Sequence, residues 1–262
     1  MTGGIEGRTA IVGGSSTGLG FAVARDLAGR GANVLIVSRS EQRVAAAVGA
    51  IQENGGAAEG CAADFTDPDA PRRVVDRARE LYGTPDIVVA NGGGPPGMPA
   101  TAATAEDLAA ACDLLLLPVQ RFAELTLPAM RASGWGRFVA ITSIAVREPL
   151  PGLVLSNALR AAVTGYLKSV SDEVASDGVT VNTVCPGFTG TDRLGVLAAN
   201  VAERDGVSVD EVFAGWAAQA PVRRLLRPEE VAAAVGFLCS AAASGITGVA
   251  LPVDGGLGRS LI

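Results

Sequence analysis

The sequence predicts an α/β fold, a single three-layer domain in which a doubly wound parallel sheet is covered by helices on both faces. Strand-like apolar runs alternate with helical patterns along the chain, and this order is typical of a parallel sheet. The runs are unbroken Val, Ile and Ala segments, as expected of strands buried on both faces. With 262 residues, 48% of them hydrophobic, residues 1–262 can form one large core.

The first predicted strand leads into a turn that indicates a phosphate site. Residues 9–12 form the strand, residues 13–20 are rich in glycine, and a helical pattern follows over 21–29. Glycines let backbone N–H groups approach a phosphate, and the helix N-terminus adds unpaired donors and a favourable dipole. The spacing is Gly-x-x-x-Gly-x-Gly, which differs from the Gly-x-Gly-x-x-Gly dinucleotide fingerprint. A purely structural turn is therefore an open alternative.

The second predicted strand, residues 33–37, completes a β-α-β unit and ends at Ser38 and Arg39. A carboxylate at this position would bind the ribose 2′-hydroxyl of NAD(H), whereas an arginine would pair with the 2′-phosphate of NADP(H). Because no carboxylate is present here, the sequence favours NADP(H). The alternative is that Arg39 is an ordinary solvated side chain.

Further apolar runs continue the alternation at residues 87–90, 137–142 and 179–184, and a helical pattern precedes each. Six landmarks follow these elements in order: Gly14-x-x-x-Gly18-x-Gly20, Asp64 after a short strand, Asn91-Gly92-Gly93, Ser143, Pro186-Gly187-x-x-x-Thr191 and Val253-Asp254-Gly255-Gly256. Together they cover nearly the whole chain and resemble the short-chain dehydrogenase/reductase family. The resemblance implies a Rossmann-type fold and a nicotinamide cofactor.

The resemblance also implies a set of cofactor-binding residues. Asp64 would face the adenine, Asn91 would support the sheet and the cofactor, and Thr191 would hold the nicotinamide carboxamide. Asp64 as a strand-end turn residue and Thr191 as a helix cap are the alternatives, and Gly13 stands where the family usually has threonine. The full expected set is Gly14, Ser15, Ser16, Gly18, Leu19, Gly20, Ser38, Arg39, Asp64, Phe65, Asn91, Gly92, Gly93, Arg160, Pro186, Gly187 and Thr191.

The catalytic positions depart from the family pattern of a serine, a Tyr-x-x-x-Lys motif and a helical asparagine. The tyrosine typically lies thirteen residues after the serine, and counting from Ser143 reaches Ser156, which places Arg160 at the lysine position. The asparagine position falls near Leu115, in the expected helix over residues 108–117. Only Ser143 therefore remains of the four expected side chains.

This departure changes the chemistry that the site can perform. A serine hydroxyl is far less acidic than a tyrosine, and Arg160 can supply charge but cannot release a proton. Ser143, Ser156 and Arg160 could still stabilise a developing oxyanion while water delivers the proton. Glu148, between the two serines, is the best titratable candidate for acid/base work, although it could equally be solvated.

Two classes of function are consistent with the sequence. The first is an NADP(H)-dependent oxidoreductase acting on a carbonyl, alcohol or imine through an atypical proton-transfer site. The second is a relative that performs a non-redox elimination or isomerisation, or only binds the cofactor. The intact glycine turn and Arg39 favour the first. Residues 189–221, which begin near Asp192 and Arg193, are the expected substrate lid, and their apolar side chains could contact substrate or pack on the body.

Composition excludes several other classes. The net charge of −6 without a basic cluster argues against nucleic acid, and the absence of histidine excludes His-based triads and His-containing zinc sites; no metal site is expected. Four dispersed cysteines are typical of free thiols in a reducing compartment. With no membrane-spanning run or signal peptide, we expect a cytoplasmic protein. The resemblance implies a homotetramer, or a homodimer, built partly from the helix over residues 156–167 and the C-terminal strand.

Overall fold

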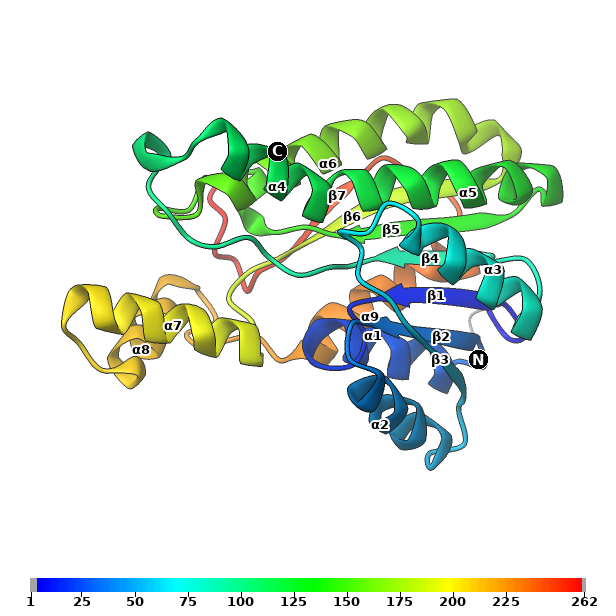
Figure 1. Ribbon diagram of the computed structural model, residues 1–262, viewed down its shortest axis with the longest axis horizontal. Helices are drawn as coiled ribbons and strands as arrows, with labels where there is room; N and C mark the ends of the chain where they lie inside the picture. The colour runs from blue at the N-terminus through cyan, green and yellow to red at the C-terminus, as the bar shows by residue number, and fades with distance from the viewer. Residues whose placement is uncertain (1–3, 261–262) are drawn as a thin grey trace.

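The computed structural model describes residues 4–260, and these form a parallel sheet of seven strands with helices on both faces (Figure 1). The strand order is β3-β2-β1-β4-β5-β6-β7. This arrangement confirms the predicted fold class. The strands are β1 Thr9–Gly13, β2 Asn33–Ser38, β3 Ala57–Ala62, β4 Ile87–Ala90, β5 Gly136–Ile141, β6 Val179–Pro186 and β7 Ala250–Val253.

The helices form two outer layers. One hydrophobic cluster joins the sheet to α1 Gly18–Gly29, α2 Glu41–Gln52 and α9 Pro228–Cys239. A second cluster joins the opposite face to α3 Ala70–Tyr82, α5 Leu117–Ser133 and α6 Val154–Val174. Strands β1, β4, β5 and β6 are buried along their whole lengths. Strand β4 is a continuous apolar run, as expected of a strand buried on both faces, whereas β6 also contains the buried polar residues Thr180, Asn182 and Thr183. Short 3₁₀ helices are η1 Ala100–Ala102, η2 Ile144–Val146, η3 Ala175–Asp177 and η4 Ala241–Ala243.

The helix that we expected over residues 108–117 is broken in the structure. Helix α4 spans Ala105–Leu115, and α5 begins at Leu117. Pro118 lies in the first turn of α5, where its missing N–H costs nothing, whereas inside a continuous helix it would remove a hydrogen bond. The break places Leu115 at a helix end beside the strand ends.

The strand order reverses between β1 and β4, which are neighbours in the sheet. The chain leaves β1 toward β2 on one side and leaves β4 toward β5 on the other, so the connections diverge and leave a crevice at the carboxyl ends of the strands. The glycine turn after Gly13 and the segment that starts at Asn91 therefore border the same crevice.

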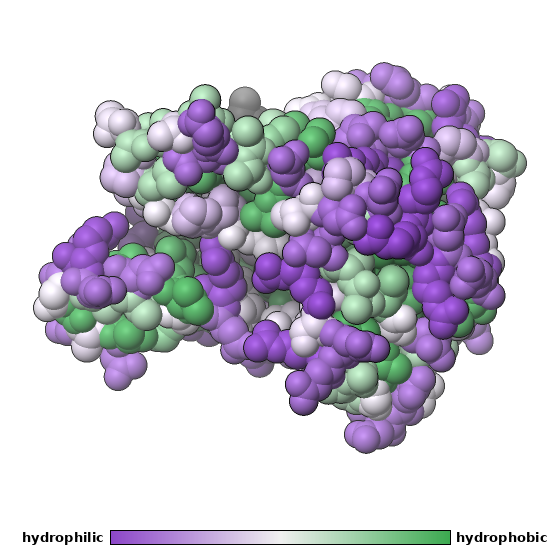
Figure 2. Space-filling model, in the orientation of Figure 1, coloured by the Kyte–Doolittle hydropathy of each residue, from purple (hydrophilic) through white to green (hydrophobic). Residues whose placement is uncertain are grey.

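Helices α7 Asp192–Asp205 and α8 Val209–Gln219 make up most of the expected lid. They form a lobe at the left of Figure 1, and a hollow separates this lobe from the body in Figure 2. The lobe has a small core of its own, in which Ala198, Ala202 and Val212 are buried. Phe188 stacks on Trp216, with ring centroids 4.9 Å apart. Among residues 4–260, no helix is both long and apolar enough to cross a membrane.

Candidate active site

A cavity of about 550 Å³ follows the crevice at the carboxyl ends of the strands. One end contains the second strand's terminus, and the other contains the first turn of α7. Most of the cofactor residues expected from the sequence line it. The lining residues are Gly14, Ser16, Thr17, Gly18, Leu19, Gly20, Ser38, Arg39, Arg43, Ala63, Asp64, Phe65, Asn91, Gly92, Gly93, Gly94, Leu114, Arg160, Thr191, Asp192, Arg193 and Val196.

The glycine turn is held in a shape that larger residues could not adopt. Gly14 has a φ of +55°, in the left-handed region. A Cβ on Gly20 would lie 2.2 Å from the carbonyl oxygen of Gly14. Asn91 fixes the turn from the neighbouring strand, because its Nδ2 donates to the carbonyl oxygens of Gly13 at 3.0 Å and Gly14 at 3.4 Å. Backbone N–H groups therefore line this part of the cavity without side chains in front of them.

The end of β2 carries positive charge. Arg39 is exposed and lines the cavity, and Arg43 in the first turn of α2 lines the same end. Neither guanidinium forms an ion pair within residues 4–260. We did not predict Arg43, although its place four residues after Arg39, at the start of a helix, was a usable signal. Ser16 donates its hydroxyl to Ser38 Oγ at 2.9 Å.

Asp64 lies near this positive end. Its Oδ1 accepts hydrogen bonds from the backbone N–H of Thr66 at 3.0 Å and from the Thr66 hydroxyl at 2.8 Å. The Thr66 backbone bond is the main cause of a lowered pKa at Asp64, and the charge of Arg39 contributes. Asp64 is therefore a turn residue and a cavity residue at once. Thr191 combines roles in the same way, because it lines the cavity and caps α7 by accepting from Leu194 N at 3.3 Å.

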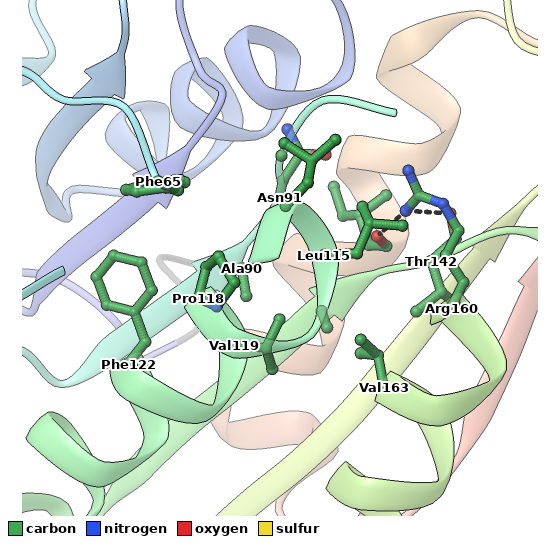
Figure 3. Close-up of a pocket in the computed structure, with 14 residues that line it drawn as sticks. Phe65, Ala90, Asn91, Leu115, Pro118, Val119, Phe122, Thr142, Arg160 and Val163 are labelled. Atoms are coloured by element: carbon green, nitrogen blue, oxygen red, sulfur yellow. Dashed lines mark hydrogen bonds between the residues drawn. The ribbon is translucent and has the colours of Figure 1, made fainter. Parts of the chain in front are cut away.

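Arg160 lines both this cavity and a smaller one beside it. Its Nη1 donates to the carbonyl oxygens of Ile141 at 3.0 Å and Thr142 at 3.2 Å, and Nε donates to Ser156 Oγ at 3.1 Å. Nη2 donates to Gly93 O at 3.4 Å. Figure 3 shows the guanidinium turned toward the end of β5. Burial, with a smaller effect from the charge of Arg193, lowers the pKa of Arg160 to about 10, so it remains a cation at neutral pH.

A small apolar cavity of about 30 Å³ adjoins Arg160 (Figure 3). This volume is enough for one or two water molecules. Leu115, which we expected near the family's asparagine position, lines it together with Pro118, Val119 and Val163. An ordered water needs two to four polar partners, and in this cavity only the part lined by Asn91, Thr142 and Arg160 carries polar side chains.

The structure brings only some of the expected catalytic residues together. Ser156 contacts Arg160, and Ser143 follows the strand end that Arg160 binds, with its Oγ accepting from Ala145 N at 3.1 Å. Glu148 points elsewhere. Its Oε1 accepts from the backbone N–H groups of Arg259 at 2.5 Å and Ser260 at 2.9 Å, and it lines neither of the two cavities described above.

Three expected cofactor residues have structural roles instead. Ser15 is fully buried, and its hydroxyl donates to Val12 O at 2.6 Å and accepts from Val37 N at 2.9 Å, which joins β1 to β2. Pro186 is buried as the last residue of β6. Gly187 donates its N–H to Val253 O at 3.0 Å. Because these groups pair within the sheet, none of them lines the cavity.

Arg193 extends from the first turn of α7 to the opposite side of the cavity. Its Nη2 donates to the carbonyl oxygen of Pro95 at 2.8 Å. This bond ties the lid to the loop that follows β4. Arg193 and Arg160 both line the cavity, and although they come from different helices, they donate to carbonyl oxygens only two residues apart, those of Pro95 and Gly93.

Comparisons with known proteins agree on the type of protein. A family model described as enoyl-(acyl carrier protein) reductase matches residues 14–258. The chain is 35% identical over 257 residues to a protein of Streptomyces virginiae named monensin polyketide synthase putative ketoacyl reductase, and the match covers 96% of this chain and 97% of the relative. It is 34% identical over 252 residues to the 3-oxoacyl-(acyl-carrier-protein) reductase FabG of Escherichia coli, with 96% and 98% covered.

Solved structures show the same fold over the whole chain. The L-sorbose reductase of Gluconobacter frateurii, in complex with NADPH and L-sorbose, matches with a TM-score of 0.93 at 32% identity and covers 100% of both chains. A single-residue variant of actinorhodin polyketide ketoreductase with NADPH matches with a TM-score of 0.93 at 29% identity and covers 99% of both chains.

Proposed function

The chain belongs to the short-chain dehydrogenase/reductase family and is an oxidoreductase of that type, and from this premise we propose that it reduces a carbonyl or imine group with NADP(H). The NADPH-bound relatives support this choice of cofactor. The glycine turn provides exposed backbone donors for a pyrophosphate. The cations at the end of β2, Arg39 and Arg43, suit a 2′-phosphate.

The observation that carries the proposed mechanism is the position of Arg160. Its donors reach the end of β5 and Ser156, so a fixed positive charge lies beside the positions that the spacing from Ser143 assigns to the family's tyrosine and lysine. NADPH, held by the glycine turn and the cations at the end of β2, would supply the hydride. As the substrate carbon accepts it, negative charge develops on the carbonyl oxygen, and Arg160 with the Ser143 and Ser156 hydroxyls stabilises that charge. Water then delivers the proton. Glu148 has no part in this step, because its carboxylate binds the C-terminal segment.

Three further features belong to the same proposal. Residues 189–221 act as the substrate lid, and the hollow beside the α7–α8 lobe supports this role (Figure 2). The resemblance to the family supports a homotetramer or a homodimer. The four free cysteines, Cys61, Cys112, Cys185 and Cys239, support a cytoplasmic location.

The experiment that tests the function follows NADPH oxidation with a panel of ketones, acetoacetyl substrates and imines. The wild type should turn over simple ketones slowly, because it has no side chain acting as general acid. Ser156→Tyr combined with Arg160→Lys restores the family's acid, and a positioned acid typically contributes about a hundredfold to ten-thousandfold in rate. Arg160→Lys alone is the matched control, since it changes the cation without adding an acid.

Two results would overturn the proposal. Fast wild-type reduction of simple ketones, with a pH profile set by a tyrosine-like group, would show that the catalytic register is wrong. Binding of NADPH without oxidation by any substrate or variant would refute the reductase assignment and favour non-redox chemistry at the same site.

A further inference from the structure

The substrate end of the large cavity contains two arginines, one on each side. Arg160 comes from α6 and Arg193 from the first turn of α7. The two are close enough that the charge of Arg193 lowers the pKa of Arg160. Two cations near each other in a cleft are unfavourable unless an anion lies between or beside them. This arrangement therefore points to a ligand that carries negative charge.

The hydrogen-bond partners of the two arginines leave their charges uncompensated. Arg160 donates only to neutral groups, namely backbone carbonyls and the Ser156 hydroxyl. Arg193 donates through Nη2 to Pro95 O, and nothing else in the part of the chain that the structure describes engages its guanidinium through a hydrogen bond or an ion pair. Most of the donors on Arg193 are thus available to a ligand.

Carboxylates of the protein do not fill this role. Asp192 also lines the cavity, but it forms no ion pair with either arginine within residues 4–260. Asp64 is bound by Thr66 and lies near Arg39, at the opposite end. The glycine turn and the two cations at the end of β2 would hold the cofactor's phosphates, which therefore do not need Arg193.

We propose that the substrate is an oxo acid, a carbonyl compound whose carboxylate binds Arg193 while its reacting oxygen lies in the field of Arg160. A guanidinium matches a carboxylate with two parallel N–H donors, and Leu114 and Val196 supply apolar contacts for the chain of the substrate. This inference rests on the proposed reductase function for its chemistry, but the binding of the carboxylate can be measured independently of turnover.

Calorimetric titration tests the proposal on the full chain, with and without NADP⁺. The ligands are pyruvate, acetoacetate, levulinate and 5-oxohexanoate, each beside its neutral methyl ester, with dihydroxyacetone phosphate as a different anion. Arg193→Gln removes the charge and keeps a donor for Pro95 O, and Arg193→Lys keeps the charge. Arg204→Gln is the matched control, because Arg204 lies on the same helix, pairs with Asp205 and does not line the cavity.

At least one oxo acid should bind the wild type more tightly than its ester. Because Arg193 is exposed, the Arg193→Gln variant should bind that acid about tenfold more weakly than the wild type. The affinity for the ester should not change. Arg193→Lys should recover part of the affinity, and Arg204→Gln should behave as the wild type. For an acid that is also a substrate, Arg193→Gln should raise KM more than it lowers kcat.

Several outcomes would overturn the proposal. The first is that the esters bind as tightly as the acids. The second is that the acids bind Arg193→Gln and the wild type with equal affinity. The third is that dihydroxyacetone phosphate binds more tightly than every oxo acid. If Arg193→Gln loses as much affinity for NADPH as for the oxo acid, the side chain binds the cofactor instead. If the wild type fails to bind NADPH at all, the reductase function fails, while the titrations without cofactor still decide whether Arg193 binds carboxylates.

Discussion

Arg39→Ala should remove most of the preference for NADPH over NADH. Arg39 is exposed and has no ion-pair partner within residues 4–260, so the 2′-phosphate would be its only strong anionic contact. A hydrogen bond to a charged group contributes about 1.5–3 kcal/mol. Because Arg39 is exposed to solvent, we expect the lower limit of this range. About 1.5 kcal/mol corresponds to a roughly tenfold higher Kd for NADPH. NADH lacks the 2′-phosphate, so its affinity should not change.

Two neighbours modify this expectation in opposite directions. Arg43 lines the same end of the cavity and should retain part of the preference, so the double variant should lose more than Arg39→Ala alone. Asp64 loses a nearby positive charge in the variant and should then repel the phosphate more strongly. Both effects are electrostatic and should weaken as salt increases.

Fluorescence titration of both cofactors at low and high ionic strength measures these changes. Arg25→Ala is the control, because Arg25 is an exposed arginine on α1 that pairs with Glu229 and does not line the cavity. Equal wild-type affinities for NADPH and NADH, or an unchanged preference in Arg39→Ala, would refute the reasoning.

The remaining predictions concern the turn, the proposed oxyanion site and acid stability. Gly20→Ala places a Cβ 2.2 Å from Gly14 O, so urea unfolding should show a loss of about 1–3 kcal/mol together with weakened NADPH binding; normal values of both would contradict the turn geometry. Ser143→Ala should lower kcat about a hundredfold to a thousandfold, and Ser156→Ala should lower it less; the reverse order would make Ser156 the principal catalytic group. The ion pair with Arg224 and the Arg227 N–H hold the pKa of Glu230 at about 2, so Glu230→Gln should cost about 0.5–1 kcal/mol at pH 7.

The pH dependence expected for Glu230→Gln follows from the direction in which the pKa of Glu230 is shifted. Since the folded pKa of Glu230 is depressed below its ordinary value of 4.5, the stabilisation is complete above about pH 4.5 and is lost as pH falls toward 2. The difference in unfolding midpoint between wild type and Glu230→Gln should therefore narrow over that range. A difference that stays constant down to pH 3 would show that the ion pair contributes nothing.

The sequence by itself determined the alternation of strands and helices and the glycine turn. These features depend on local periodicity and on backbone conformations that few residues adopt, so neighbouring residues are enough to reveal them. The alternation also predicts a doubly wound parallel sheet, but it is compatible with more than one strand order, and the structure supplies the order β3-β2-β1-β4-β5-β6-β7. Most of the residues expected around the point where this order reverses line the cavity.

Only the tertiary structure decided how the charged side chains are used. Arg160 contacts Gly93, 67 residues away, Arg193 contacts Pro95, 98 residues away, and Glu148 binds Arg259, 111 residues away. Such partners depend on the packing of elements that are distant in the chain, and no local pattern encodes them. The same holds for Ser15, whose hydroxyl faces β2 rather than the cavity because the sheet closes around it. Long side chains acquire their roles from the surroundings that the complete fold creates, whereas a glycine turn carries its own conformational requirement.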